Sequence, residues 1–196
     1  IAKAGGIPPL VALVRDGNDA QKASAADALW GLAANDDNRL AIAKAGGIPP
    51  LVALIRDGTD AQKEEAALAL AKLANSADNQ VLIAEAGGIP PLVALICDGN
   101  AAQKANAANA LGNLVECDDN IAKAGGYPPL VALVRDGNDA QKASAAFALG
   151  NLASFCDDNQ IAIAKADGIP PLVALVRDGN DKQKEYAAGA LQNLAA

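Results

Sequence analysis

The chain has 196 residues, of which 52% are hydrophobic but only 3% aromatic, and its net charge is −7. The acidic balance argues against binding to a nucleic-acid backbone, which requires clustered Lys and Arg. No apolar run approaches the roughly 20 residues that span a bilayer, so no membrane partner is expected.

One segment, GGIPPLVALVRDGNDAQKASAADALWGLA at residues 5–33, recurs along the whole chain. Its five copies begin at Gly5, Gly46, Gly87, Gly125 and Asp167, which are 41, 41, 38 and 42 residues apart. A period near forty is typical of a solenoid, in which each repeat packs only on its neighbours. We therefore predict a single all-α solenoid domain over residues 1–196, with repeats at about 1–34, 35–75, 76–116, 117–154 and 155–196.

Each repeat is predicted to contain three helices. A short first helix lies in Asp36–Gly47, where the aspartates can cap its amino end and a glycine can stop it in a left-handed conformation. The second helix, Pro8–Gly17, has prolines in its first turn, where a missing N–H costs nothing. The third and longest helix spans roughly Asp19 to Ala34. Asn18 precedes this helix and Gln21 lies in its first turn, which indicates a capping box.

The segment GGIPPLVALV, followed by ALGNLA at residues 148–153, resembles the armadillo repeat. The resemblance covers all five copies and separates the chain from other helical repeats. It implies a right-handed superhelix whose third helices line a concave groove that binds extended peptides. The near identity of the copies is also what a consensus design or a recent duplication produces.

Two linkers depart from the regular length. The linker after Asn120 is three residues shorter than its counterparts, which removes almost one turn from the first helix of the fourth repeat. The linker around Phe155 has one extra residue. These differences are explained either by drift in loop length or by a local change of superhelical curvature between the third and fourth repeats.

Three columns of the third helix vary in chemical type between the copies and lie three residues apart, on one helix face. They are Ser24, Glu65, Asn106, Ser144 and Tyr186; Asp27, Leu68, Asn109, Phe147 and Gly189; and Trp30, Ala71, Gly112, Gly150 and Gln192. Exposed positions that contact nothing vary freely, which explains part of the pattern. The columns nevertheless hold three of the five aromatic residues of the chain, and aromatic side chains in a groove are good anchors for a partner.

The adjoining column contains Gly31, Lys72, Asn113, Asn151 and Asn193. In the armadillo family, the Asn of this motif hydrogen-bonds the main chain of a bound peptide, and the resemblance implies the same role for these asparagines. The first two repeats lack the Asn. Nuclear import receptors of the family also carry a Trp one turn earlier, and this chain has none there, so a receptor for nuclear localisation signals is not expected. The predicted peptide-binding residues are Asn113, Asn151, Asn193, Asn109, Phe147, Tyr186, Trp30, Asn106 and Gln192.

The sequence lacks the usual chemistry of an enzyme. It contains no His, which removes the commonest general base and metal ligand, and no nucleotide-binding or nucleophile motif. The Asp-Asp pairs of the linkers are assigned to helix capping, since they lack the spacing of a calcium loop. Cys97, Cys117 and Cys156 fit no metal-ligand pattern, and a rise of one repeat between the last two argues against a disulfide. We expect no catalytic residues, metal or cofactor.

These observations favour a non-enzymatic scaffold that binds an extended peptide or a flexible protein segment in its groove. The alternative is a structural or designed scaffold with no dedicated ligand. Because the chain begins at Ile1 within a repeat, we interpret it as a segment of a longer array. End-to-end self-association through uncapped repeats would then be expected. Free thiols predict a cytoplasmic location, with the nucleus as the alternative.

Overall fold

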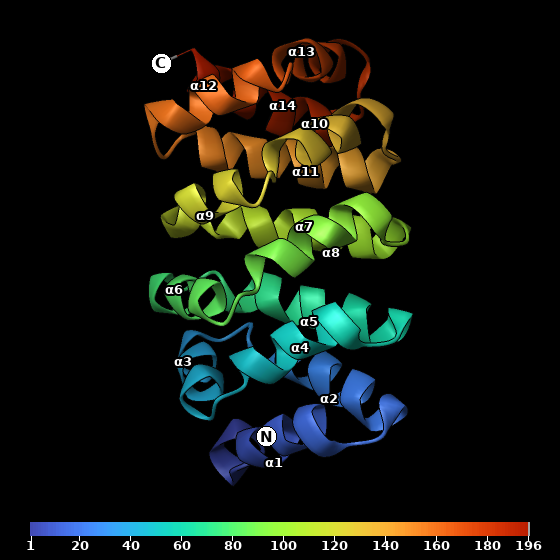
Figure 1. Ribbon diagram of the computed structural model, residues 1–196, viewed down its shortest axis with the longest axis vertical. Helices are drawn as coiled ribbons and strands as arrows, with labels where there is room; N and C mark the ends of the chain where they lie inside the picture. The colour runs from blue at the N-terminus through green and yellow to red at the C-terminus, as the bar shows by residue number, and fades with distance from the viewer. Residues whose placement is uncertain (196) are drawn as a thin grey trace.

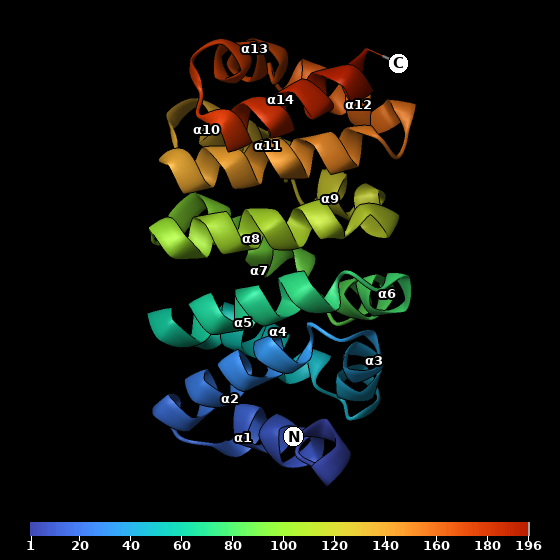
Figure 2. The same ribbon diagram turned by 180° about the vertical axis from the view of Figure 1, so that it is seen from behind.

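The computed structural model describes residues 1–195, with the side chains of residues 117 and 118 outside the description. The repeats are stacked one on another along a single axis (Figure 1). The third helices lie side by side on one face, which Figure 2 shows, and the second helices lie on the other. The first helices run along one edge. The predicted all-α solenoid is therefore confirmed.

The helices fall into three sets by their position in the repeat. The first set is the 3-10 helix η1 (Ala2–Ala4), α3 (Asp36–Lys44), α6 (Ala77–Glu85), α9 (Asp118–Lys123) and α12 (Asp157–Lys165). The second set is α1 (Ile7–Asp16), α4 (Ile48–Asp57), α7 (Ile89–Asp98), α10 (Tyr127–Asp136) and α13 (Ile169–Asp178). The third set is α2 (Asp19–Leu32), α5 (Asp60–Leu73), α8 (Ala101–Asn113), α11 (Asp139–Ala153) and α14 (Asp181–Leu194).

Local sequence signals fix where these helices begin and end. All five third helices start with the predicted capping box, in which the Asn or Thr side chain and the Gln side chain each accept from the other residue's backbone N–H. The prolines lie in the first turn of every second helix. Four first helices are followed by a glycine with φ near +70°, as at Gly46, whereas Asp167 holds this conformation in the fifth repeat with φ 60°.

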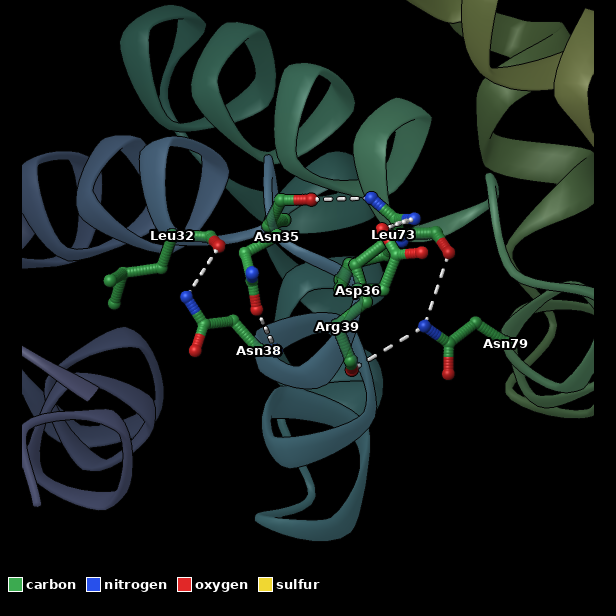
Figure 3. Close-up of polar contacts among 8 residues, drawn as sticks. Leu32, Asn35, Asp36, Asn38, Arg39, Leu73 and Asn79 are labelled. Atoms are coloured by element: carbon green, nitrogen blue, oxygen red, sulfur yellow. Dashed lines mark hydrogen bonds and ion pairs between the residues drawn. The ribbon is translucent and has the colours of Figure 1, made fainter. Parts of the chain in front are cut away.

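In α3 and α12 the aspartate pair lies in the first turn and is not the N-cap, so the capping prediction was wrong for these helices. The N-cap of α3 is Asn35, whose side chain accepts from the backbone N–H of Asn38 at 3.1 Å. Asp36 and Asp37 follow it in the first turn, where their charge suits the helix dipole, and Asp36 also pairs with Arg39 (Figure 3). An N-cap must lie outside the helix, whereas Asp36 is already the first residue of α3.

The side chains that follow these aspartates tie the first helix to the end of the preceding third helix. Asn38 Nδ2 donates to the carbonyl of Leu32 at 2.9 Å, and Asn79 Nδ2 donates to the carbonyl of Leu73 at 3.1 Å (Figure 3). Carbonyls in the last turn of a helix have no partner within it, so these amides satisfy them. Asn79 also reaches the carbonyl of Arg39 in the neighbouring repeat.

The core is continuous along the array and is made mainly of Ala, Leu, Ile and Val. Leu29, Leu70, Leu111 and Leu149 are fully buried at one position of the third helix, with small alanines around them. Small side chains let the helices approach closely and leave little room for change. A Cβ at Gly112 would lie 2.6 Å from the Cα of Ala148 in the next third helix.

A second set of buried amides connects one repeat to the next. Gln62, Gln103 and Gln183 complete the capping box of their own helix. Their Nε2 atoms also donate to the backbone carbonyl and the carboxylate of the aspartate that begins the preceding third helix. Gln103 is 2% exposed, whereas Gln21 in the first of the described repeats is exposed. One residue type therefore both starts a helix and fixes the position of its neighbour.

The fourth repeat has the shortened first helix that its linker predicts. Helix α9 has 6 residues where α3, α6 and α12 have 9. The 3-10 helix η2 (Val115–Cys117) precedes it, and Gln80 accepts from the backbone N–H of Glu116 at 2.9 Å. The change of superhelical curvature stays a prediction. The proposed absence of a Cys117–Cys156 disulfide falls on a side chain outside the description.

Within residues 1–195, no single helix is long and apolar enough to cross a membrane. Helices α6 and α7 together meet the same requirement of length and composition, but they are bent by 81° at the break between them.

The positive φ at Asp167 gives a first prediction. Asp167→Gly should raise the free energy of unfolding by about 0.5–1 kcal/mol, because glycine adopts this conformation without the steric cost of a Cβ. Urea unfolding followed by circular dichroism measures the change. Gly125→Asp is the matched control and should lower the stability, and an unchanged or lower stability of Asp167→Gly would contradict the explanation.

The buried glutamines give a second prediction. Gln103→Ala should destabilise the array by about 1–3 kcal/mol, since it removes the capping bond to the N–H of Asn100 and both inter-repeat bonds of a buried amide. Gln21→Ala removes the same capping bond at an exposed site and should cost about 0.5 kcal/mol. Equal losses for the two variants, measured by the same urea unfolding, would show that the inter-repeat bonds contribute nothing.

Candidate functional site

A groove runs over the third helices, on the face seen in Figure 2. Its volume is about 610 Å³, and its lining comes from all five repeats, from Trp30 of α2 to Tyr186 of α14. The lining residues are Trp30, Leu68, Ala71, Lys72, Asn75, Asn109, Asn113, Asp139, Ala140, Ala143, Ser144, Phe147, Asn180, Lys182 and Tyr186. A groove of this length suits an elongated molecule rather than a compact one.

Five of the nine predicted site residues line this groove: Trp30, Asn109, Asn113, Phe147 and Tyr186. The other four, Asn106, Asn151, Gln192 and Asn193, lie on the same third helices but are not among its lining residues. Their role in binding stays a prediction.

Some lining residues were not predicted. Lys182 stands where the other copies have Ala20, Ala61, Ala102 and Ala140, so a comparison of that column would have found it. Asp139 and Asn180 belong to the conserved capping segment of the repeat. Their contribution depends on the curvature of the stack, and no column of the sequence signals it.

The asparagines of the ALGNLA motif hold adjacent repeats together. Asn113, Asn151 and Asn193 donate through Nδ2 to the carbonyls of Ala71, Gly112 and Gly150, at 2.9, 3.0 and 2.9 Å. Each acceptor belongs to the preceding third helix. The first two repeats have Gly31 and Lys72 at this position, and the structure shows no such bond there among the described residues. The motif therefore has a structural role in addition to the binding role implied by the family.

Packing explains part of one variable column. Gly112 and Gly150 lie where the next third helix crosses, with Ala148 and Ala190 closest to them. Packing therefore explains the small residue at Gly112, where a Cβ would lie 2.6 Å from Ala148, but not the Trp30 of the same column, which also has a third helix after it. In the column of Phe147, the members of the three middle copies line the groove: Leu68, Asn109 and Phe147.

Phe147 and Tyr186 form the apolar part of the groove. Their ring centroids are 5.4 Å apart with an interplanar angle of 55°, an edge-to-face type of arrangement. The ammonium group of Lys182 lies 5.6 Å from the centroid of the Tyr186 ring. Both rings are half-buried, so they are held in place and still offer a surface to a partner.

In the first two repeats, Asp27 stands at the position of Phe147 and Glu65 at that of Tyr186, with Glu64 beside it. Partial burial, followed by the charges of Asp27 and Glu64, raises the pKa of Glu65. None of these three carboxylates forms an ion pair among the described residues. A cation placed beside Glu65 would relieve this repulsion. These carboxylates lie on the third helices of the first two repeats but do not line the groove, whose charged lining residue there is Lys72.

The chain resembles solved structures of engineered repeat proteins. One engineered protein has 32% identity and a TM-score of 0.93, covering 97% of this chain and 79% of its own. A designed armadillo repeat protein in complex with the peptide (KR)4 has 28% identity and a TM-score of 0.91, covering 98% and 83%. Computationally designed armadillo repeat proteins for modular peptide recognition show 28% identity and a TM-score of 0.88, covering 98% and 83%.

The family models agree with the structure. The model of the Armadillo/beta-catenin-like repeat matches residues 35–75 and 156–196, and that of the HEAT-like repeat matches residues 60–114. No curated protein matches the chain. Stacked three-helix units with a groove over their third helices define an α-solenoid. The chain belongs to the armadillo repeat family, and its regular copies are consistent with a designed member of it.

Proposed function

We propose that this protein is a non-enzymatic scaffold that holds an extended peptide, or a flexible protein segment, along the groove of its third helices. The observation that carries the proposal is the groove itself, which crosses all five repeats and joins amide side chains to an aromatic pair. A designed armadillo protein of the same fold is described in complex with a peptide, which supports the proposal.

The groove offers two kinds of contact. The amides of Asn109 and Asn113 can donate to and accept from the main chain of a peptide, since an amide has two N–H groups and one carbonyl oxygen. Asn113 uses one N–H on the carbonyl of Ala71, which fixes its orientation before a peptide arrives. The Phe147–Tyr186 pair would bind an apolar side chain, and such aromatic anchors provide much of the affinity of an interface.

Charge favours one direction of binding. Basic side chains of the peptide would lie over the first two repeats and reach Asp27, Glu64 and Glu65, which are on the third helices there but outside the groove lining that holds Lys72. The apolar side chain would then lie over the fourth and fifth repeats. We propose no catalysis, because no group of three His, Cys, Asp or Glu among the described residues is placed to hold a metal ion, and the sequence has no His.

Selection from a random library of extended peptides tests this function. The selected peptides should combine basic residues with one apolar residue, and Phe147→Ala should weaken their binding about tenfold or more, as expected for a hot-spot residue. Phe155→Ala is the matched control, since Phe155 is exposed but does not line the groove. Unchanged peptide affinity in Phe147→Ala, or equal weakening in both variants, would exclude the groove as the binding site.

A second candidate function, end-to-end self-association, rests on the exposed face of α13. Ile169, Val173 and Val176 are 41%, 50% and 37% exposed there. At the same positions of α4, Ile48, Val52 and Ile55 are 2–3% exposed because the next repeat covers them. The first repeat of another copy has the sequence to cover α13 in the same way. Such a head-to-tail contact would extend into longer assemblies.

Light scattering over a range of protein concentrations tests this association. The mean mass should rise with concentration, and Val173→Glu should keep the protein monomeric because it places a charge in the apolar contact. Val81→Glu changes an equally exposed valine on α6 and should leave the association unchanged. A constant monomer mass at all concentrations would exclude this second function.

A further inference from the structure

Four cavities lie at equivalent places between successive repeats, each lined by the second helices and the first turns of the third helices. Three of them have volumes of about 320, 240 and 280 Å³. The cavity between the third and fourth repeats, beside α7 and α10, has a volume of about 650 Å³. These helices are neighbours in the stack (Figure 1). We call this enlarged cavity the α7–α10 cavity.

Two sequence differences coincide with its size. The three smaller cavities are each lined by an arginine at the end of the second helix and an aspartate at the start of the third, as with Arg56 and Asp60. The α7–α10 cavity has Cys97 and Ala101 at these two positions. Both differences replace a charged side chain by a smaller one, so the cavity gains room and loses one positive and one negative charge.

The missing aspartate leaves a glutamine with fewer bonds. Gln62, Gln103 and Gln183 each donate through Nε2 to a backbone carbonyl and to an aspartate Oδ1, the latter at 3.0, 3.2 and 3.1 Å. Gln141 is the equivalent residue, and its Nε2 donates to the carbonyl of Ala101 alone, at 3.3 Å. Gln141 is only 7% exposed and lines the cavity, so its second N–H faces a place where the other repeats hold a carboxylate oxygen.

A cation lines the same cavity. Lys104 lines the cavity, and its Nζ donates to the carbonyl of Cys97 at 2.8 Å. The lining carboxylate of Asp136 already pairs with Arg135, at 2.9 Å. The rest of the lining includes Pro128, Pro129 and Leu133. One cation and one amide N–H therefore face a largely apolar cavity.

We propose that the α7–α10 cavity binds a small carboxylic acid with an apolar body. The carboxylate accepts from Gln141 Nε2, as an aspartate does in the other repeats, and it pairs with the ammonium group of Lys104. The apolar body packs on the two prolines and Leu133. The volume lies within the range of small-molecule sites, about 300–1,000 Å³. This site is distinct from the peptide groove and does not depend on the proposed function.

Titration of the isotope-labelled protein with phenylbutyrate, followed by nuclear magnetic resonance, tests the site. The side-chain amide signal of Gln141 should shift in a saturable way. Ala101→Asp should weaken binding at least about tenfold, since the new carboxylate occupies the amide and repels the ligand. Ala102→Asp adds the same charge one residue further along α8, outside the cavity lining, and should leave binding unchanged.

Two more measurements complete the test. Phenylbutyramide, which lacks the charge, should bind more weakly than phenylbutyrate, and phenylbutyrate should slow the alkylation of Cys97, measured by peptide mass spectrometry. Lys104→Gln removes the cation, should also weaken binding, and serves if Ala101→Asp folds poorly. The proposal is overturned if the Gln141 signal does not shift, if the amide binds as tightly as the acid, or if Ala101→Asp and Ala102→Asp bind equally.

Discussion

Buried side-chain amides that bond the backbone of the neighbouring repeat are the interaction on which this solenoid depends. Packing of Ala and Leu drives the repeats together, but apolar contact has no direction, and similar surfaces could slide past one another. Gln103 and Asn151 remove that freedom, because each donates to a backbone carbonyl at one position of the preceding repeat. An amide buried without its partner costs free energy, so the correct register is favoured over all others.

The same bonds explain how much of the fold the sequence predicts. Helix ends were predictable, because a capping box such as Asn18 with Gln21, or a glycine such as Gly46, acts within a few residues. The aspartate pairs of α3 and α12 were assigned wrongly, since any polar residue before a helix resembles a cap until the first turn is located. The second bond of Gln103 was not predictable. Its partner lies 43 residues away, and only the stacked backbone brings the two together.

The candidate site, like the fold, was predictable from the sequence only in part. Phe147 and Tyr186 could be found by comparing the copies, because a large aromatic side chain among small residues is visible in a column, and the structure places the two rings 5.4 Å apart. Gly112 differs from the residues at the same position of other repeats because of packing, since Ala148 of the next helix leaves no space for a side chain. Sequence variation alone does not separate a surface that binds from a surface that packs. The distance from a residue to the next repeat does separate these two kinds of surface.

A repeat array also shows what each deviation changes, because its other copies serve as references. The third and fourth repeats keep the capping box and the buried Gln141, so the stack continues through them. Cys97 and Ala101 differ only at the edge of that interface, where they remove charge and volume without removing a bond to the backbone. Different atoms of Gln141 therefore fix the register of the repeats and remain available to a ligand. Its carbonyl oxygen caps its own helix, its first N–H bonds the preceding repeat, and its second N–H is what a change at residue 101 sets free.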